Sequence, residues 1–282
     1  MKSSPTAFTV ATSGQLLPFI AQQRACSLRK AKALLDQRVV LVNGRRTWMA
    51  RHPLRPGDRV EIPPTALTTP PPGRAPVLQV LFENGNFVVF DKPAGWLSNG
   101  PNSLETYWRR DPRWSSARAV HRLDRDTTGT LCAALQPDAY DHLVDSFRCG
   151  HVLKVYHAIV APGPIERQGT IGRPIEGKTA ITHWTVRARN RTAAHLRLKI
   201  DTGRTHQIRK HLSGQGWPVA GDRQYQTGPL HSASLRAVPR QMLHAAVLQA
   251  PLGPGGRMVR VAAPLPADFR QTLRQFSLPD TD

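Results

Sequence analysis

Apolar residues alternate with polar ones, or gather into short runs, over much of the chain, and this pattern predicts a fold dominated by β-strands. Between residues 194 and 200 apolar side chains recur at every second position, which is typical of a half-buried strand. Residues 77–90 hold two apolar runs on either side of Asn84-Gly85, a strong hairpin signal. Further strands are predicted over 129–135, 152–160, 179–189, 241–249 and 258–262.

Apolar residues at helical spacing predict a few helices between these strands. Residues 138–147 place four apolar side chains on one side of a helix. Two more helices are expected over 206–212, directly after Gly203, and over 267–276. A large mixed, mainly antiparallel sheet with a few helices is an α+β architecture, and this is the fold class predicted for residues 77–276.

The first 62 residues are predicted to form a small unit of their own. We expect a short basic helix over 28–35, a strand over 39–42, turns at Asn43-Gly44 and 54–58, and a strand over 59–62. Residues 63–76 read PPTALTTPPPGRAP, a composition that favours extended polyproline geometry and forms no packed element. The prediction is a small α/β domain over 14–62, a Pro-rich linker over 63–76 and a large domain over 77–276.

The charge of the chain gives a first indication of function. Of its 282 residues, 39 are Lys or Arg and 19 are Asp or Glu, so the formal net charge is +20. A field of that sign attracts polyanions, of which nucleic acid is the commonest large one. The alternative is a protein whose surface is merely basic. No long basic amphipathic helix stands out, so a role at a membrane surface is not expected.

The cysteines and the N-terminus restrict the class of protein further. Cys26, Cys132 and Cys149 lack CxxC spacing, which argues against a disulfide framework or a zinc site and suits a reducing compartment. We therefore expect no metal. The first 18 residues lack the layout of a signal peptide, and no apolar run approaches transmembrane length. A cytoplasmic protein that does not enter a membrane is the expectation.

The densest polar cluster of the chain lies between two apolar stretches. Residues 119–135 read AVHRLDRDTTGTLCAAL, with the charged side chains gathered between His121 and Asp126. Such a cluster beside buried strands is costly unless its charges pair with one another or take part in chemistry. The pattern alone leaves two interpretations open, a network of salt bridges in a loop and a functional site.

HRLDRDTTG, at residues 121–129, resembles the catalytic motif HRLD-x-x-T-S-G of the RluA-type RNA pseudouridine synthases, with Thr128 in place of the serine. Other motifs of that family are matched in order along the chain: DKPAG at 91–95, KVYHA at 154–158, GRTHQIR at 203–209, GWPVAGD at 216–222 with Trp217 in place of a histidine, and LHA at 243–245. One such motif is weak evidence, whereas five in order are specific. The resemblance covers residues 77–265.

Residues 14–62 resemble an S4-type RNA-binding domain, particularly in the segments VLVNGRR and LRPGDRVEI. Where such domains open with Arg-Leu-Asp, this chain has Leu16-Leu17-Pro18. The resemblance implies that the small unit grips RNA. The alternative is a folded cap with a basic surface.

The family resemblance implies that the chain converts uridine to pseudouridine in structured RNA. The bond between uracil N1 and the ribose breaks and the ring bonds again through C5, which needs no redox step, no group donor and hence no cofactor. By the same resemblance Asp124 is the nucleophile or charge stabiliser beside the sugar, and Arg209 keeps it ionised. Tyr156 is expected to stack on the uracil. Proton transfer by Tyr156 is the less expected role, because a phenol with a pKa of about 10 is a weak base at neutral pH.

The target base must leave the RNA stack, so the resemblance also implies base flipping. Arg122 is expected to fill the space that the base vacates. Candidates for phosphate contacts are Lys92, Arg125, Lys154, Arg204 and Lys210. Large-subunit ribosomal RNA is the expected substrate, because an S4-type domain often accompanies it in similar enzymes, and transfer RNA is the alternative. A monomer is expected.

Two interpretations from other classes remain open at this point. A catalytically inactive RNA-binding or ribosome-assembly factor would carry the same charge, but it would have no need of Asp124, Tyr156 and Arg209 together. A hydrolytic glycosylase would use Asp124 and Asp126 as paired carboxylates, although such near neighbours in sequence are expected to diverge in direction.

Overall fold

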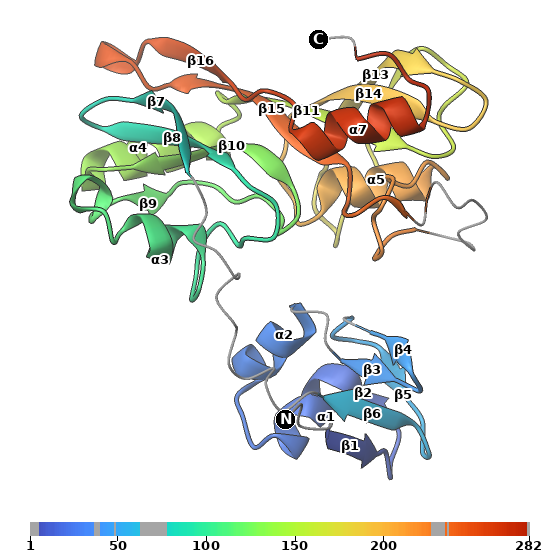
Figure 1. Ribbon diagram of the computed structural model, residues 1–282. Helices are drawn as coiled ribbons and strands as arrows, with labels where there is room; N and C mark the ends of the chain where they lie inside the picture. Colours follow the sequence, from blue (N-terminus) through green and yellow to red (C-terminus); the bar gives the residue numbers. More distant parts are fainter. Residues whose placement is uncertain are drawn as a thin grey trace. The chain divides into compact units, whose positions relative to one another are not determined.

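The computed structural model describes residues 6–36, 40–47, 49–62, 78–226, 235 and 237–280. The chain divides into two compact units, residues 1–73 and 74–282 (Figure 1). The segment 63–76, predicted as a Pro-rich linker, lies outside the described residues.

The N-terminal unit joins a four-stranded sheet to two helices. Its elements are β1 (Thr6–Thr9), β2 (Gly14–Gln15), α1 (Leu16–Gln23), α2 (Leu28–Asp36), β3 (Leu41–Val42), β4 (Arg45–Arg46), β5 (Pro53–Leu54) and β6 (Arg59–Ile62). The sheet order is β1-β6-β3-β4, and β2 pairs with β5. Side chains of both helices and of the sheet, among them Leu16, Ile20, Leu35 and Val60, form a buried core. The unit therefore has its own source of hydrophobic stabilisation.

The apolar pattern located α2, β3 and β6 of this unit but did not predict its other strands. The helix expected over 28–35 is α2, and the strand expected over 59–62 is β6. Asn43 and Gly44 form the predicted turn with φ values of 51° and 72°, the left-handed backbone that a two-residue hairpin requires. The pattern did not predict α1, which contains Pro18. Pro18 is tolerated because it lies in the first turn, where a backbone N–H has no helical partner to lose.

The larger unit is built on one ten-stranded sheet. Its strands are β7 (Gln79–Glu83), β8 (Phe87–Lys92), β9 (Arg118–Ala119), β10 (Thr128–Ala134), β11 (Leu153–Val160), β12 (Gln168–Ile171), β13 (Thr182–Arg189), β14 (Ala194–Ile200), β15 (Leu243–Pro251) and β16 (Met258–Ala262). The main path runs β12-β13-β14-β11-β15-β10-β8-β7, with β16 on β15 and β9 on β10. The pairing of β10 with β15 is parallel and the other strand pairs described are antiparallel. The predicted α+β class with a large mixed, mainly antiparallel sheet is confirmed.

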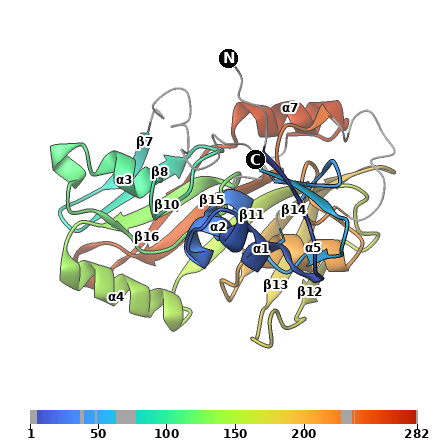
Figure 2. The ribbon, with the colours of Figure 1, turned by 90° about the horizontal axis from the view of Figure 1, so that it is seen from below.

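Helices accompany both halves of this sheet. The half around β7, β8 and β10 carries α3 (Leu104–Trp108) and α4 (Pro137–Arg148), and the half around β13 and β14 carries α5 (Gln207–Gly214) and α7 (Ala267–Gln275), as Figures 1 and 2 show. The described residues of the unit also include the short 3-10 turns η2 (Pro112–Trp114) and η3 (Pro254–Gly256). No helix in the described part of the chain has both the length and the apolar character that a membrane crossing needs.

The predicted helices α4, α5 and α7 lie where apolar spacing placed them, but α3 and β12 were missed. Elements of five and four residues are too short to show a period. Helix α3 is specified instead by a capping box between Ser103 and Thr106. It is also fixed by Trp108, whose ring stacks on Phe90 with centroids 4.9 Å apart.

The parallel pair β10–β15 fixes the end of the polar segment 121–127. Gly129 has a φ of +107°, and a Cβ added there would lie 2.1 Å from the carbonyl oxygen of Ala245. A residue with a side chain would force the two strands apart, so the close approach requires glycine. Beside it, Thr128 Oγ1 lies 2.8 Å from His244 Nδ1. The residues just before β10 are thereby anchored to β15.

Candidate active site

A hollow of about 110 Å³ opens where the loop before β10, strand β11 and the N-terminal end of α5 meet. Asp124 comes from the loop, Tyr156 from β11 and Arg209 from α5. Apolar side chains such as Ile200 and Leu243 complete the wall. The three residues predicted to carry the chemistry therefore line one pocket.

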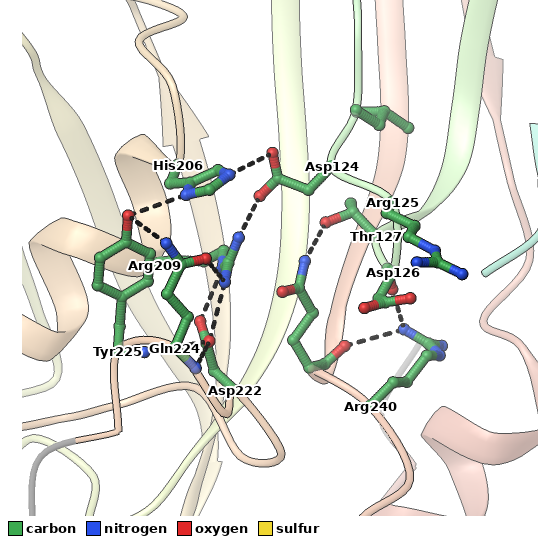
Figure 3. Close-up of polar contacts among 12 residues, drawn as sticks. Asp124, Arg125, Asp126, Thr127, His206, Arg209, Asp222, Gln224, Tyr225 and Arg240 are labelled. Atoms are coloured by element: carbon green, nitrogen blue, oxygen red, sulfur yellow. Dashed lines mark hydrogen bonds and ion pairs between the residues drawn. The ribbon is translucent and has the colours of Figure 1, made fainter. Parts of the chain in front are cut away.

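Arg209 holds Asp124 and a second carboxylate at the same time (Figure 3). Its Nη1 donates to Asp124 Oδ2 at 2.9 Å, while Nε and Nη2 donate to the two oxygens of Asp222 at 2.6 and 2.9 Å. The side chain of Arg209 is 1% exposed and that of Asp124 is 20% exposed. The planar guanidinium suits this arrangement, because its fork can bind one carboxylate bidentately and still offer a donor to another.

The protonation states of this group depend on one another. Burial opposes the charge on Arg209, but the hydrogen bond and charge of Asp222, together with the charge of Asp124, raise the pKa of Arg209 above its ordinary value. Burial likewise opposes the charge on Asp222, but hydrogen bonds and the charge of Arg209 lower the pKa of Asp222 below its ordinary value. Arg209 and Asp222 are charged at neutral pH, and Asp124 faces a permanent cation.

Lys92 does not contact solvent and supports the loop that carries Asp124. It is 0% exposed, and its Nζ donates to the carbonyls of Pro93 at 2.9 Å, Arg125 at 2.8 Å and Thr127 at 2.9 Å. An ammonium has three protons, so its donors are fully used. The prediction that Lys92 contacts phosphate is therefore wrong. The sequence offers no sign of this, because a lysine between an apolar strand and a Pro-Ala-Gly turn looks like a surface residue.

Two further side chains fix the same loop. Ser98 Oγ accepts from the backbone N–H of Leu123 at 2.9 Å and donates to its carbonyl at 3.1 Å. On the other side of Asp124, Nη1 of Arg240 donates to the carbonyl of Asp126 at 3.0 Å (Figure 3). The backbone on both sides of Asp124 is thus held by groups far away in sequence, which limits where the carboxylate can lie.

Lys154 is also unsuited to the phosphate contact predicted for it. It is 7% exposed, and its Nζ lies 5.9 Å from the ring centre of Phe147. Burial lowers the pKa of Lys154, against the opposing charge of Asp201. The periodicity of β11 explains the error, because residues 154–156 lie in a stretch of this central strand that is buried on both faces.

The remaining predicted RNA contacts lie at the surface. Arg122 and Arg204 are exposed and line the pocket. Arg125 is exposed, with its Nε donating to the carbonyl of Gly95 at 3.0 Å. Lys210 is half-buried and pairs with Glu176 at 2.9 Å. Contact with RNA stays a prediction for all four residues.

Tyr156 is 8% exposed and lines the pocket next to Asp124. Burial, and then the charge of Asp124, raise the pKa of Tyr156 above the ordinary value of a phenol. The hydroxyl is therefore protonated at neutral pH. This favours contact by the ring, or donation by the hydroxyl, over removal of a proton by a phenolate.

Four residues of the site were not singled out from the sequence. Asp222, Gln224, Tyr225 and His206 surround Arg209 and Asp124 (Figure 3). His206 and Asp222 belong to the segments GRTHQIR and GWPVAGD, so a signal for them was present. Gln224 and Tyr225 follow the second segment and carry no signal of their own.

No group of three or more His, Cys, Asp or Glu side chains within the described residues is arranged to hold a metal ion. The pocket is lined by a carboxylate, a phenol, an imidazole and the guanidinium groups of Arg122, Arg204 and Arg209.

Comparisons with known proteins identify the family of the chain. Residues 86–214 match the family described as RNA pseudouridylate synthase. The chain is 35% identical over 223 residues to the "Ribosomal large subunit pseudouridine synthase D" of Pseudomonas aeruginosa. The matched region spans 68% of this chain and 69% of that protein. The chain is 30% identical over 297 residues to the protein of the same name in Xanthomonas campestris, over 93% of this chain and 87% of that protein.

Solved structures show the same fold. The protein titled "Human RNA Pseudouridylate Synthase Domain Containing 1" superposes with a TM-score of 0.59 at 27% identity, over 75% of this chain and 99% of that chain. "Human RNA Pseudouridylate Synthase Domain Containing 4" gives a TM-score of 0.62 at 23% identity, over 72% and 94%.

Proposed function

The chain belongs to the RNA pseudouridylate synthase family, and from this premise we propose that it isomerises uridine to pseudouridine in large-subunit ribosomal RNA with Asp124 as its nucleophile. The observation that carries the proposal is the contact of 2.9 Å between Asp124 Oδ2 and Arg209 Nη1 in the wall of a pocket that also holds Tyr156. A carboxylate that is partly exposed and paired with a buried, permanently charged guanidinium is available for attack on a sugar carbon.

The reaction needs only the groups in this pocket. Asp124 attacks, or stabilises the charge at, the anomeric carbon as its bond to uracil N1 breaks. The uracil leaves as an anion and remains in the pocket. It turns, C5 bonds to the anomeric carbon as the carboxylate leaves, the hydrogen on C5 is lost as a proton, and N1 gains one. Substrate and product have the same composition, so no co-reactant is consumed.

Arg209 and Tyr156 support this chemistry in different ways. Arg209 keeps the charge of Asp124 in place while its own position is fixed by Asp222. Tyr156 presents its ring to the uracil and, since its phenol is protonated, donates a hydrogen bond to the detached anion.

The pocket lies at the surface, so a target base reaches it only by leaving its stack in the RNA. Arg122, exposed beside Asp124, fills the vacated space. Arg125, Arg204 and Lys210 contact phosphates, and the N-terminal unit acts as an S4-type RNA-binding domain. The net charge of +20 supports binding of a polyanion.

Ribosomal RNA is chosen over transfer RNA because the relatives in Pseudomonas aeruginosa and Xanthomonas campestris are named for the large ribosomal subunit. We further propose that the enzyme acts as a monomer in the cytoplasm, where ribosomal RNA is found.

Release of tritium from uracil C5 tests the proposal. Ribosomal and transfer RNA are labelled at that position and incubated with the wild type and with Asp124→Asn, and the salt-sensitive RNA binding of both proteins is measured. Release from large-subunit RNA by the wild type alone, with RNA binding retained by Asp124→Asn, is expected. Release by Asp124→Asn would overturn the role of Asp124. Release from transfer RNA only would overturn the substrate, and free uracil among the products would indicate a glycosylase.

A further inference from the structure

Five side chains, Asp124 among them, form a closed ring of polar contacts (Figure 3). Starting from Arg209, Nη2 contacts Gln224 Oε1 at 3.1 Å, and Gln224 Nε2 contacts the hydroxyl of Tyr225 at 3.3 Å. That hydroxyl lies 2.9 Å from His206 Nδ1, and His206 Nε2 lies 3.5 Å from Asp124 Oδ1. The contact of 2.9 Å between Asp124 Oδ2 and Arg209 Nη1 closes the ring.

Some groups in the ring can only donate a hydrogen bond and others can only accept one. This sets the direction of the hydrogen bonds around the ring. A guanidinium only donates, so Gln224 must present its carbonyl oxygen to Arg209. The amide orientation is then fixed, and its NH₂ group points to Tyr225 as a donor. The oxygen of Tyr225 accepts that bond, which leaves its own hydrogen free to be donated elsewhere.

The hydrogen of Tyr225 favours one tautomer of His206. Donation to Nδ1 requires that this nitrogen carries a lone pair, so the ring proton sits on Nε2. The other end of the ring requires the same state, because an ionised carboxylate only accepts and would repel a lone pair on Nε2. Both neighbours of the imidazole therefore favour the form with a proton directed at Asp124.

The imidazole is also uncharged. Burial lowers the pKa of His206 to about 4, and Arg209 and Lys210 act in the same direction, while Asp124 and Asp222 oppose it. His206 therefore offers Asp124 a second donor without a second positive charge. The two oxygens of the carboxylate thus face different partners, Arg209 Nη1 at 2.9 Å and His206 Nε2 at 3.5 Å, of which only the first is charged.

We propose that His206 and Tyr225 are positioning residues for Asp124, in which the Tyr225 hydroxyl holds His206 as the Nε2–H tautomer and this N–H sets the plane of the carboxylate for attack. The inference rests on the proposed role of Asp124. The contact of 3.5 Å is long for a hydrogen bond, and hydrogen bonds of an active site commonly tighten when substrate binds.

His206 is held in place by its backbone as well as by Tyr225. It directly precedes α5 and has a φ of 57°. This left-handed conformation is uncommon for a residue other than glycine and is often found at functional sites. The turn aims the ring out of the helix and toward the loop of Asp124.

Nitrogen-15 NMR of the full chain, labelled in histidine, tests the tautomer directly. The signals of His206 are assigned by their loss in His206→Gln. At neutral pH the wild type is expected to show a protonated Nε2 and an unprotonated Nδ1. Gln224→Glu keeps the shape of that side chain but removes its donor, so Tyr225 turns its hydrogen toward residue 224 and Nδ1 is expected to gain a proton. Protonation of Nδ1 in the wild type, or no change in Gln224→Glu, would overturn the inference.

Turnover measurements test the consequence for catalysis. His206→Phe removes the donor and is expected to lower kcat by about 10- to 100-fold, as for other residues that orient a reacting group, with KM for the RNA unchanged. His206→Gln retains an N–H for Asp124 and a carbonyl for Tyr225, so it is expected to recover part of that loss. Both variants carry the same strain at φ 57°, which makes them a matched pair.

The two proposals fail in different ways. Equal kcat for His206→Phe and the wild type, with Asp124→Asn inactive, would overturn the positioning role and leave the nucleophile intact. Full activity of Asp124→Asn would overturn the nucleophile, and with it the catalytic part of this inference. The NMR result would still decide whether the ring has the direction described.

Discussion

Arg240 and Asp268 form a bidentate ion pair, with Nε to Oδ2 at 2.6 Å and Nη2 to Oδ1 at 2.9 Å. The remaining nitrogen of Arg240 donates to the carbonyls of Asp126 and Gln241 at 3.0 and 2.9 Å. Asp268 lies on α7, so the last helix of the chain fixes the loop that carries Asp124. Helix α7 therefore supports the pocket although none of its residues lines it.

Asp268→Asn is expected to weaken this support. The side chain of Arg240 is 7% exposed and that of Asp268 is 36% exposed, so partial hydration limits the loss of unfolding free energy to about 1–2 kcal/mol. We also expect kcat to fall while KM for the RNA stays the same. Urea unfolding and tritium release measure the two effects. As a control, Asp145→Asn breaks a pair whose side chains are 76% and 61% exposed, and a change beyond about 0.5 kcal/mol there would contradict the argument from burial.

Arg209→Lys is expected to separate charge from geometry in the pocket. A lysine keeps the positive charge, but its single ammonium cannot bind Asp222 bidentately and also reach Asp124. We expect kcat to fall by about 10²- to 10³-fold, and the unfolding free energy to fall by about 3–5 kcal/mol because Asp222 is buried. Activity assayed at a temperature where circular dichroism shows the variant folded distinguishes the two losses. Wild-type kcat in the folded variant would mean that charge alone is sufficient.

Residues that line the pocket were easier to predict from the sequence than the buried residues around it. Asp124, Tyr156 and Arg209 were selected because their segments resemble family motifs, and the structure brings all three to one pocket. Lys92 and Lys154 were assigned to the surface, because a local pattern does not reveal that a lysine is buried. Their burial is set by pairings between strands far apart in the chain, which the order of residues does not specify.

The same limit explains which elements were missed. Strand β14 is long enough, at seven residues, for the alternation of apolar residues to define both ends. Helix α3 has five residues and depends on a capping box and on Trp108 packing against Phe90. The partner of Trp108 lies on β8, so the reason for the helix is a tertiary contact.

Gly129→Ala is expected to disrupt the parallel pair of β10 and β15. The new Cβ would lie 2.1 Å from the carbonyl oxygen of Ala245, at a φ of +107°. Strain and displacement together are expected to lower the unfolding free energy by about 3 kcal/mol or more, which thermal unfolding would record. Gly85→Ala is the matched control, because no atom lies within 4 Å of its added Cβ, and a change within about 0.5 kcal/mol is expected. Equal effects at the two positions would contradict this account.

Arg122→Ala and Arg204→Ala are expected to weaken RNA binding at every sequence. Both side chains are exposed at the pocket, so each substitution should reduce the slope of log affinity against log salt by about 1 if the arginine contacts a phosphate. Fluorescence anisotropy with labelled RNA over a range of salt measures this slope. Arg148→Ala removes an exposed arginine of α4 that does not line the pocket. A slope that changes as much for Arg148→Ala as for the other two would indicate general attraction in place of defined contacts.

Above pH 7 the stability and the activity of the wild type are expected to change in opposite directions, because Lys92 loses its charge in the folded chain. Burial lowers the pKa of Lys92 from 10.5 to about 7, against the opposing charges of Asp126 and Asp124. Between these two values the unfolded chain binds more protons at this residue than the folded chain, so the contribution of Lys92 to stability rises with pH, by at most about 1.4 kcal/mol per pH unit. Below pH 7 both states are protonated and this contribution is constant.

Activity is expected to change in the opposite direction over the same range. A neutral amine has two protons, whereas three carbonyls around Asp124 accept from Nζ, so loss of the third proton loosens the loop above pH 7. Lys92→Met removes the titration, and the difference in unfolding free energy between wild type and variant should grow from pH 7 to pH 9. Urea unfolding and kcat are measured in parallel across that range. A difference that is flat with pH would mean that Lys92 stays charged throughout, and that its three hydrogen bonds outweigh its burial.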